Sequence, residues 1–249
     1  MLRECLIICP LVFVAGYIDA VAGGGGLVSL PAYMITGIPV HQCVATNKMS
    51  AFMGTSVAAL KYAKSGYIPW KTAAFCIPCA LAGSAVGANF ALMISDRMLQ
   101  IIMLVIVPLT GLYVVTRKGE FSSKRELSFG TAAAVSSVIS LVIGIYDGFY
   151  GPGTGTFLIL LLTGIVGMDI REANGLTKAV NWSTNVSALS VFLINGQVLF
   201  PLGLIAGLFN IAGNYLGAAG FQKKGAGIAK VVIIVVLVVF FVKLVMGLL

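Results

Sequence analysis

The chain has 249 residues and a net charge of +8, with 59% hydrophobic residues, only 10% charged residues and a mean hydropathy of +1.04. An ordinary soluble domain has about 25% charged residues, because its exposed shell needs polar cover, so this composition excludes one. The basic residues gather in a few short loops without interleaved aromatic residues, which excludes a nucleic-acid partner and indicates a polytopic membrane protein.

Long apolar stretches follow one another along the chain and predict membrane helices, since a helix needs about 20 apolar residues to cross a bilayer. Two further apolar segments, 26–37 and 155–168, are too short to cross comfortably, and each follows a glycine-rich turn. These short segments indicate broken helices or re-entrant hairpins, although two full spans would give the same sidedness. The long segments are expected at 4–22, 43–63, 71–94, 97–115, 128–147, 175–195, 199–219 and 228–248.

The two halves of the chain resemble each other. Asp19 and Asp147 are 128 positions apart, and the glycines around them keep the same spacing. After each short segment the spacing becomes 130, as it is for Lys48 and Lys178. The pattern predicts a duplication of the kind found in transporters. We expect a first membrane repeat at 1–115, a cytoplasmic linker loop at 116–127 and a second membrane repeat at 128–249.

Each half contains five segments, and this odd number implies that the second half is inverted across the bilayer. The loop charges agree with an inversion, because loop 61–71 holds three lysines whereas its counterpart 195–200 holds no charge. The fold class predicted is therefore all-α, with two inverted five-segment repeats. Both termini are expected outside the cytoplasm, and the cytoplasmic loops are expected at 61–71, 116–127, 168–175 and 220–230.

The two glycine turns are candidate anion sites. They lie in "YIDAVAGGGGLVSLP" and "YDGFYGPGTGTFLIL", directly before the short helical segments. A glycine turn at the start of a helix presents backbone N–H groups that attract an anion. The turn residues predicted to bind substrate are Gly24, Gly25 and Gly26 in the first half and Gly153, Thr154 and Gly155 in the second.

Two polar motifs, "ATNKMS" and "LTKAVNWSTN", begin long helices and supply candidate side chains. Lysines at membrane depth are costly, so we interpret them as cationic anchors for an anion, with amides and hydroxyls as oriented donors. The alternative is a packing role, in which polar side chains join helices and each lysine only pairs with an aspartate. The candidates are Thr46, Asn47, Lys48, Thr177, Lys178, Asn181 and Asn185.

Asp19 and Asp147 repel an anion, so they need another role. Each lies four residues before the first matched glycine, which favours a carboxylate that accepts hydrogen bonds from the backbone N–H groups of the turn and braces it. The alternative is coupling, in which a carboxyl group at membrane depth takes up a proton and carries it with, or against, the anion. A proton or another ion is therefore a candidate coupling partner.

No catalytic motif is found in the sequence. Cys76 and Cys79 form a C-x-x-C inside an apolar span, but no second cysteine pair or histidine partner follows. His41 is the only histidine, so neither a Ser-His-Asp set nor an H-E-x-x-H zinc motif is present. We expect no enzyme activity, no metal site and no cofactor.

The turn segments, together with "ATNKMS", "LTKAVNWSTN" and "AGNYLGAAGFQKKGAGIAK", resemble the TauE/SafE family of sulfite and organosulfonate exporters over nearly the whole chain. The resemblance implies a carrier in the cell inner membrane that moves small sulfur-containing anions, usually outward. Because no ATPase motif is present, an ion gradient or the membrane potential is the expected driving force. The alternative is an anion channel, or a carrier for another small anion. The turns differ in sequence, Gly-Gly-Gly-Gly against Gly-Pro-Gly-Thr-Gly, so the half-sites are not identical.

Overall fold

The computed structural model describes residues 2–102, 105–106, 109 and 127–220. Within this part of the chain all regular elements are helices, and the predicted all-α class is confirmed. Several predictions fall outside the described residues: much of the span 97–115, nearly all of the linker 116–127, the span 228–248 and nearly all of the lysine loop 220–230.

The predicted segments within the described part are all found as helices. Their bounds are α1 (Leu2–Ala22), α2 (Gly26–Met34), α3 (Val40–Lys64), α4 (Trp70–Met93), α6 (Phe129–Phe149), α7 (Thr154–Leu161) with a following π-helical turn (Leu162–Val166), α8 (Ile170–Ile194) and α9 (Phe200–Gly220). Of these, α1, α4, α6 and α9 are long and apolar enough to cross a membrane.

The starts of these helices follow from local chemistry. Ser128 caps α6 by accepting a hydrogen bond from the backbone N–H of Thr131, and Asp169 caps α8 by accepting one from Arg171. Such caps satisfy backbone N–H groups that have no partner inside the helix. Pro39 and Pro69 directly precede α3 and α4 as their N-cap residues, a position where the missing N–H of proline breaks no helical hydrogen bond.

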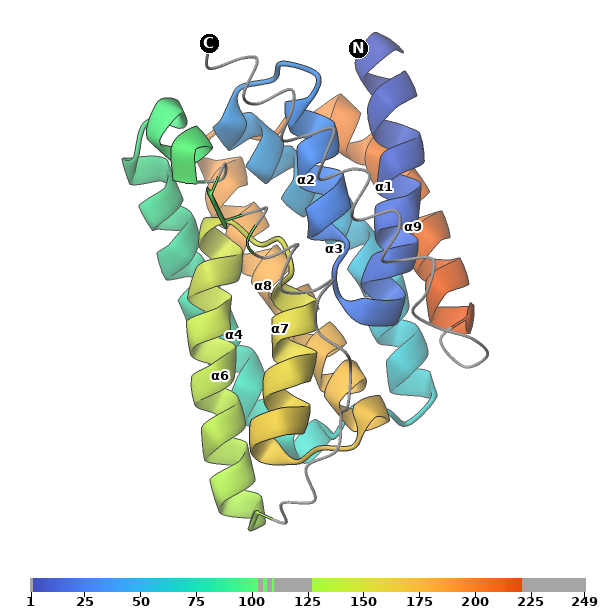
Figure 1. Cartoon of the computed structure of the whole chain (residues 1–249), viewed down its shortest axis with the longest axis vertical. Helices are drawn as coiled ribbons and strands as arrows, with labels where there is room; N and C mark the ends of the chain where they lie inside the picture. Colours follow the sequence, from blue (N-terminus) through green and yellow to red (C-terminus); the bar gives the residue numbers. More distant parts are fainter. Residues whose placement is uncertain (1, 103–104, 107–108, 110–126, 221–249) are drawn as a thin grey trace.

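The long helices form three neighbouring groups. The helices α3 and α8 lie side by side in the centre, α1 and α9 pack together next to α3, and α4 and α6 pack together next to α8 (Figure 1). The hairpin α1–α2 enters from the end that carries the N-terminus, and the hairpin α6–α7 enters from the opposite end (Figure 1). Both hairpin turns therefore lie inside the bundle; their sidedness in a membrane stays a prediction.

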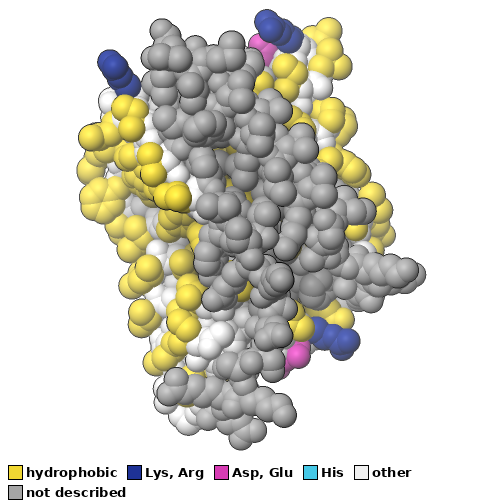
Figure 2. All heavy atoms as spheres, viewed as in Figure 1, with side chains coloured by type: hydrophobic (Ala, Val, Ile, Leu, Met, Phe, Trp, Pro, Cys, Tyr) yellow, Lys and Arg dark blue, Asp and Glu magenta, His cyan; other side chains and the backbone are white. Residues whose placement is uncertain are grey.

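The surface has the distribution expected of a membrane protein. Large apolar side chains such as Phe90, Val142 and Leu208 are exposed on the outer helices. Figure 2 shows apolar side chains covering both flanks, whereas the visible Lys, Arg, Asp and Glu side chains lie near the two ends. Together with the apolar helices, this belt identifies a protein that passes through a membrane several times.

Glycines allow the outer helices to pack closely on their neighbours. On α4, a Cβ atom at Gly83 or Gly87 would collide with backbone atoms of α6. On α9, Gly213 and Gly217 lie in the same way against the backbone of α1. Small residues at helix contacts let membrane helices approach each other, so these positions serve packing.

Gly87→Ala is expected to destabilise the protein by about 1–3 kcal/mol, because the added methyl group collides with the carbonyl of Ile145. Gly130→Ala is the matched control, since a Cβ there would meet no atom of the described residues within 4 Å. It should leave stability unchanged or raise it by up to about 1 kcal/mol through helix propensity. Thermal unfolding of the purified protein in detergent measures both; equal shifts for the two variants would contradict the close contact.

Candidate functional site

The two glycine turns touch each other in the interior. Gly23 of the first turn lies directly against the backbone of Gly155, and Gly26 lies against Pro152 of the second turn. Gly23, with a φ of 72°, adopts a left-handed conformation that glycine alone accepts easily. The contact also leaves no room for a side chain there. The N-terminal ends of α2 and α7, which follow these turns, therefore meet at one place.

A cavity of about 50 Å³ lies where the turns meet. Ten of the predicted site residues line it: Asp19, Gly25, Gly26, Asn47, Lys48, Asp147, Thr154, Gly155, Asn181 and Asn185. Five do not: Gly24, Thr46, Gly153, Thr177 and Lys178. Thr46 instead accepts a hydrogen bond at 3.0 Å from the backbone N–H of Leu199 and holds the start of α9.

Among the described residues, Lys48 on α3 is the cation that lines the cavity. Its Nζ atom lies 2.7 Å from Oδ2 of Asp147 on α6, and it donates a further hydrogen bond at 3.3 Å to Oδ1 of Asn185 on α8. The two charged side chains are only 4% and 7% exposed. A lysine of the first half is thus neutralised by an aspartate of the second half.

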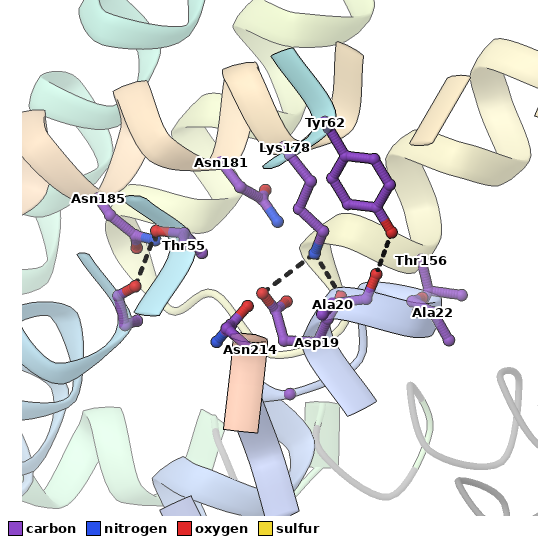
Figure 3. Close-up of polar contacts among 12 residues, drawn as sticks. Asp19, Ala20, Ala22, Thr55, Tyr62, Thr156, Lys178, Asn181, Asn185 and Asn214 are labelled. Atoms are coloured by element: carbon purple, nitrogen blue, oxygen red, sulfur yellow. Dashed lines mark hydrogen bonds and ion pairs between the residues drawn. The ribbon is translucent and has the colours of Figure 1, made fainter. Parts of the chain in front are cut away.

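Lys178 on α8 makes the opposite pairing. Its Nζ atom lies 3.0 Å from Oδ2 of Asp19 on α1 and also donates to the backbone carbonyl of Asp19 (Figure 3). Its side chain is completely buried, and it does not line the cavity. The two lysines are therefore not equivalent: Lys48 is available to a ligand in the cavity, whereas Lys178 is held behind Asp19.

The aspartates contact the turns in a way that the sequence did not predict. Oδ1 of Asp147 accepts a hydrogen bond at 2.8 Å from the hydroxyl of Thr154, which begins α7. The backbone N–H of Gly23 donates at 2.9 Å to the backbone carbonyl of Asp19, not to its carboxylate. Asp147 thus braces its turn through a side-chain hydroxyl. Within the described residues, no turn N–H bonds either carboxylate.

Sequence reasoning missed the contribution of α9. Asn210 lines the cavity, and its side-chain oxygen accepts a hydrogen bond at 2.6 Å from Nδ2 of Asn214. Both side chains are buried. The signal was present, because an amide inside an apolar membrane segment is itself costly and needs a reason.

The polar lining of the cavity carries charges of both signs. Lys48 supplies a positive charge beside the carboxylates of Asp19 and Asp147. The first turns of α2 and α7 place two helix N-termini at the cavity, where some N–H groups, such as that of Thr154, already donate to a turn carbonyl. Asn181 adds an amide that faces the cavity from α8, with its oxygen unpartnered within the described residues. In the same part of the chain, no group of three or more His, Cys, Asp and Glu side chains could hold a metal ion.

Comparison with known proteins gives a consistent result. The family described as sulfite exporter TauE/SafE matches residues 8–244. A probable membrane transporter protein, ORF9, from Sinorhizobium sp. is 34% identical over 235 residues, which cover 93% of this chain and 88% of that protein. A probable membrane transporter protein from Haemophilus influenzae is 31% identical over 229 residues, covering 90% and 87%. YfcA of Escherichia coli K12, also a probable membrane transporter protein, is 29% identical over 232 residues, covering 92% and 85%. No solved structure matches significantly.

Proposed function

The chain belongs to the sulfite exporter TauE/SafE family, and we propose that it is a secondary transporter that exports small sulfur-containing oxyanions across the cytoplasmic membrane. Sulfite or a short organosulfonate is the proposed substrate. The names of its relatives, which are probable membrane transporters, support the transport class. The proposal that the substrate is an anion is supported mainly by the ammonium group of Lys48, which lies beside the cavity where two helix N-termini meet.

The size of the cavity favours a compact anion. A single water molecule needs about 10–15 Å³ of such volume, so the cavity of about 50 Å³ has room for about four atoms of that size. Sulfite, with four heavy atoms, is of this order of size. A longer organosulfonate requires the two turns to separate, so sulfite is the better fit to this conformation.

The binding site lies between elements of both halves. Lys48 on α3 and Asp147 on α6 form one ion pair across the halves, and Lys178 on α8 and Asp19 on α1 form the other. A movement of α1, α3 and α9 relative to α4, α6 and α8 therefore changes both ion pairs and the cavity together. This arrangement favours a carrier, which alternates between states, over a channel with a continuous pore.

The purified protein in liposomes is expected to take up labelled sulfite with saturation and to show counterflow, because a carrier exposes its site to one side at a time. Unlabelled sulfite should compete better than a longer organosulfonate, as the cavity volume indicates. Liposomes that contain the Lys48→Ala variant serve as the control. Unsaturable flux that follows only the membrane potential would assign the protein as an anion channel instead.

A further inference from the structure

Side chains from three elements hold the last turn of α1. Tyr62 of α3 donates its hydroxyl at 2.9 Å to the carbonyl of Ala20, and Thr156 of α7 donates at 2.8 Å to the carbonyl of Ala22. Lys178 of α8 donates to the carbonyl of Asp19 and pairs with its carboxylate (Figure 3). The last carbonyls of a helix have no partner inside that helix, so these three contacts, the α1 clamp, fix its end.

Within residues 127–220, the second half has no equivalent of the α1 clamp. At the spacings of 128 and 130, Val28 corresponds to Thr156, and Phe192 corresponds to Tyr62. Neither valine nor phenylalanine has a hydroxyl group to donate. Lys48, the counterpart of Lys178, donates to side-chain oxygens of Asp147 and Asn185. The end of α1 is therefore held through its backbone carbonyls as well as a side chain, whereas the end of α6 is held through the side chain of Asp147.

Beyond the α1 clamp, two polar side chains of α8 are buried without partners. Asn174 and Thr177 are both 0% exposed. Within the described residues, the side-chain nitrogen and oxygen of Asn174 have no hydrogen-bond partner. The hydroxyl of Thr177 has none either. Polar groups buried in this way destabilise a protein, and most of them are paired. The presence of these unpartnered groups is explained if they form hydrogen bonds with a ligand, with water or with other side chains in another conformation of the protein.

Asn174 lies on the face of α8 that lines the cavity. The steps from Asn174 to Lys178, Asn181 and Asn185 are four, three and four residues, which keeps all four on one helix face. Asn174 is seven residues from Asn181, or about 10 Å along the helix. Lys178 lies between them. The polar face of α8 therefore continues past the cavity, and the α1 clamp interrupts it at Lys178.

This polar face leads toward the end of the molecule where the three-lysine loop 61–71 lies. Gly175, next to Asn174, contacts the backbone of Tyr67 and Ile68 in that loop. The loop charges predict that this end faces the cytoplasm. A path along the polar face of α8 would thus connect the cavity with the cytoplasmic side.

We propose that Asn174 and Thr177 form a second anion-binding site on the transport pathway, and that the α1 clamp is the gate between this site and the cavity. The proposal rests on the transport function proposed above. The amide and the hydroxyl supply donors but no charge, so the site binds a compact oxyanion weakly and releases it readily. When the gate opens, Lys178 leaves Asp19 and its ammonium group turns toward the same path.

The first test measures access to Asn174 with a hydrophilic maleimide. Asn174→Cys is made in a background in which the five native cysteines are alanines, and the protein is placed in lipid nanodiscs with both faces open. Labelling is expected to be slow while the clamp is intact, and at least tenfold faster when Tyr62→Phe and Thr156→Val remove its hydroxyls. Leu176→Cys, which is equally buried but belongs to the apolar core, is the control and should stay slow.

The outcomes separate the gate from the substrate. If Asn174→Cys and Thr177→Cys label no faster than Leu176→Cys after the clamp is loosened, by either the hydroxyl variants or Asp19→Asn, the proposal is overturned. If labelling accelerates and added sulfite slows it again, both the path and the anion are supported. If labelling accelerates but sulfite has no effect, the path is supported and the sulfite assignment fails on its own.

The second test separates transport from packing. Asn174→Leu removes the unpartnered amide at similar volume, so it should raise the thermal stability of the protein. A residue with only a packing role would leave sulfite transport unchanged or improved by this substitution. We expect the maximal rate of sulfite uptake to fall at least tenfold while competition at the cavity is unchanged. Full transport activity in a stabilised Asn174→Leu protein would contradict the second site.

Discussion

Lys48→Ala is expected to weaken sulfite binding about 10- to 100-fold. Lys48 is the cation that lines the cavity, and a hydrogen bond to a charged group contributes about 1.5–3 kcal/mol. The binding of labelled sulfite to the purified protein measures the loss directly. Lys48→Arg should restore only part of the affinity, because a planar guanidinium group is larger than an ammonium group and places its donors differently.

The controls for Lys48 separate binding from folding. Removing one partner of a buried ion pair leaves the other charge unpaired and costs about 3–5 kcal/mol, so Lys48→Ala alone destabilises the protein through Asp147. The double variant Lys48→Ala with Asp147→Asn removes this charge and should recover stability but not sulfite binding. The matched pair Lys178→Ala with Asp19→Asn changes no cation that lines the cavity. Equal loss of affinity in the two double variants would show that Lys48 has no special role.

The fold could be predicted because apolar length in a membrane protein is a strong signal. A helix satisfies its own backbone hydrogen bonds, so an apolar stretch of sufficient length has few alternatives in a bilayer. The short segments also gave a correct expectation of short helices, since α2 has nine residues and α7 has eight. The early start of α8 at Ile170 was not predicted, because its first turns contain Arg171 and Glu172 and read as a loop.

The candidate site was predicted from single residues. The sequence left open that each lysine pairs with an aspartate, but it did not predict which lysine pairs with which aspartate. Matching positions in the two halves pointed to Lys48, Lys178, Asp19 and Asp147, and the structure brings all four near one cavity. The spacing of 130 residues between matching positions predicts equivalent roles for Lys48 and Lys178. Their difference arises from three-dimensional contacts, since only Lys178 also bonds the end of a helix. Asn210 was missed because the candidates were sought as charged residues or motifs at matching positions of the two halves. Asn210 is uncharged and has no matching motif in the first half.

Asp147→Asn is expected to abolish the accumulation of sulfite driven by a proton gradient while leaving sulfite exchange intact. The lysines and aspartates at the cavity form two pairs with no excess charge. An anion that binds Lys48 takes the place of the carboxylate of Asp147 and leaves that buried charge without its cation. A proton that binds together with the anion would restore the balance of charge. A sulfite dianion that leaves with one proton still carries negative charge outward, so the membrane potential drives export.

The test compares two aspartates with the same chemistry and different positions. An asparagine at position 147 can still accept from Lys48 with its oxygen and can donate from its amide nitrogen to the hydroxyl oxygen of Thr154, so the turn keeps its brace but the proton carrier is lost. Liposomes with an imposed pH gradient measure accumulation, and labelled sulfite on both sides measures exchange. Asp19→Asn should retain the pH dependence, because Asp19 lines the cavity but pairs with Lys178, which lies behind it, and not with the cation that binds the anion. If Asp147→Asn accumulates sulfite with an unchanged pH dependence, Asp147 only braces the turn, and the coupling ion must bind elsewhere.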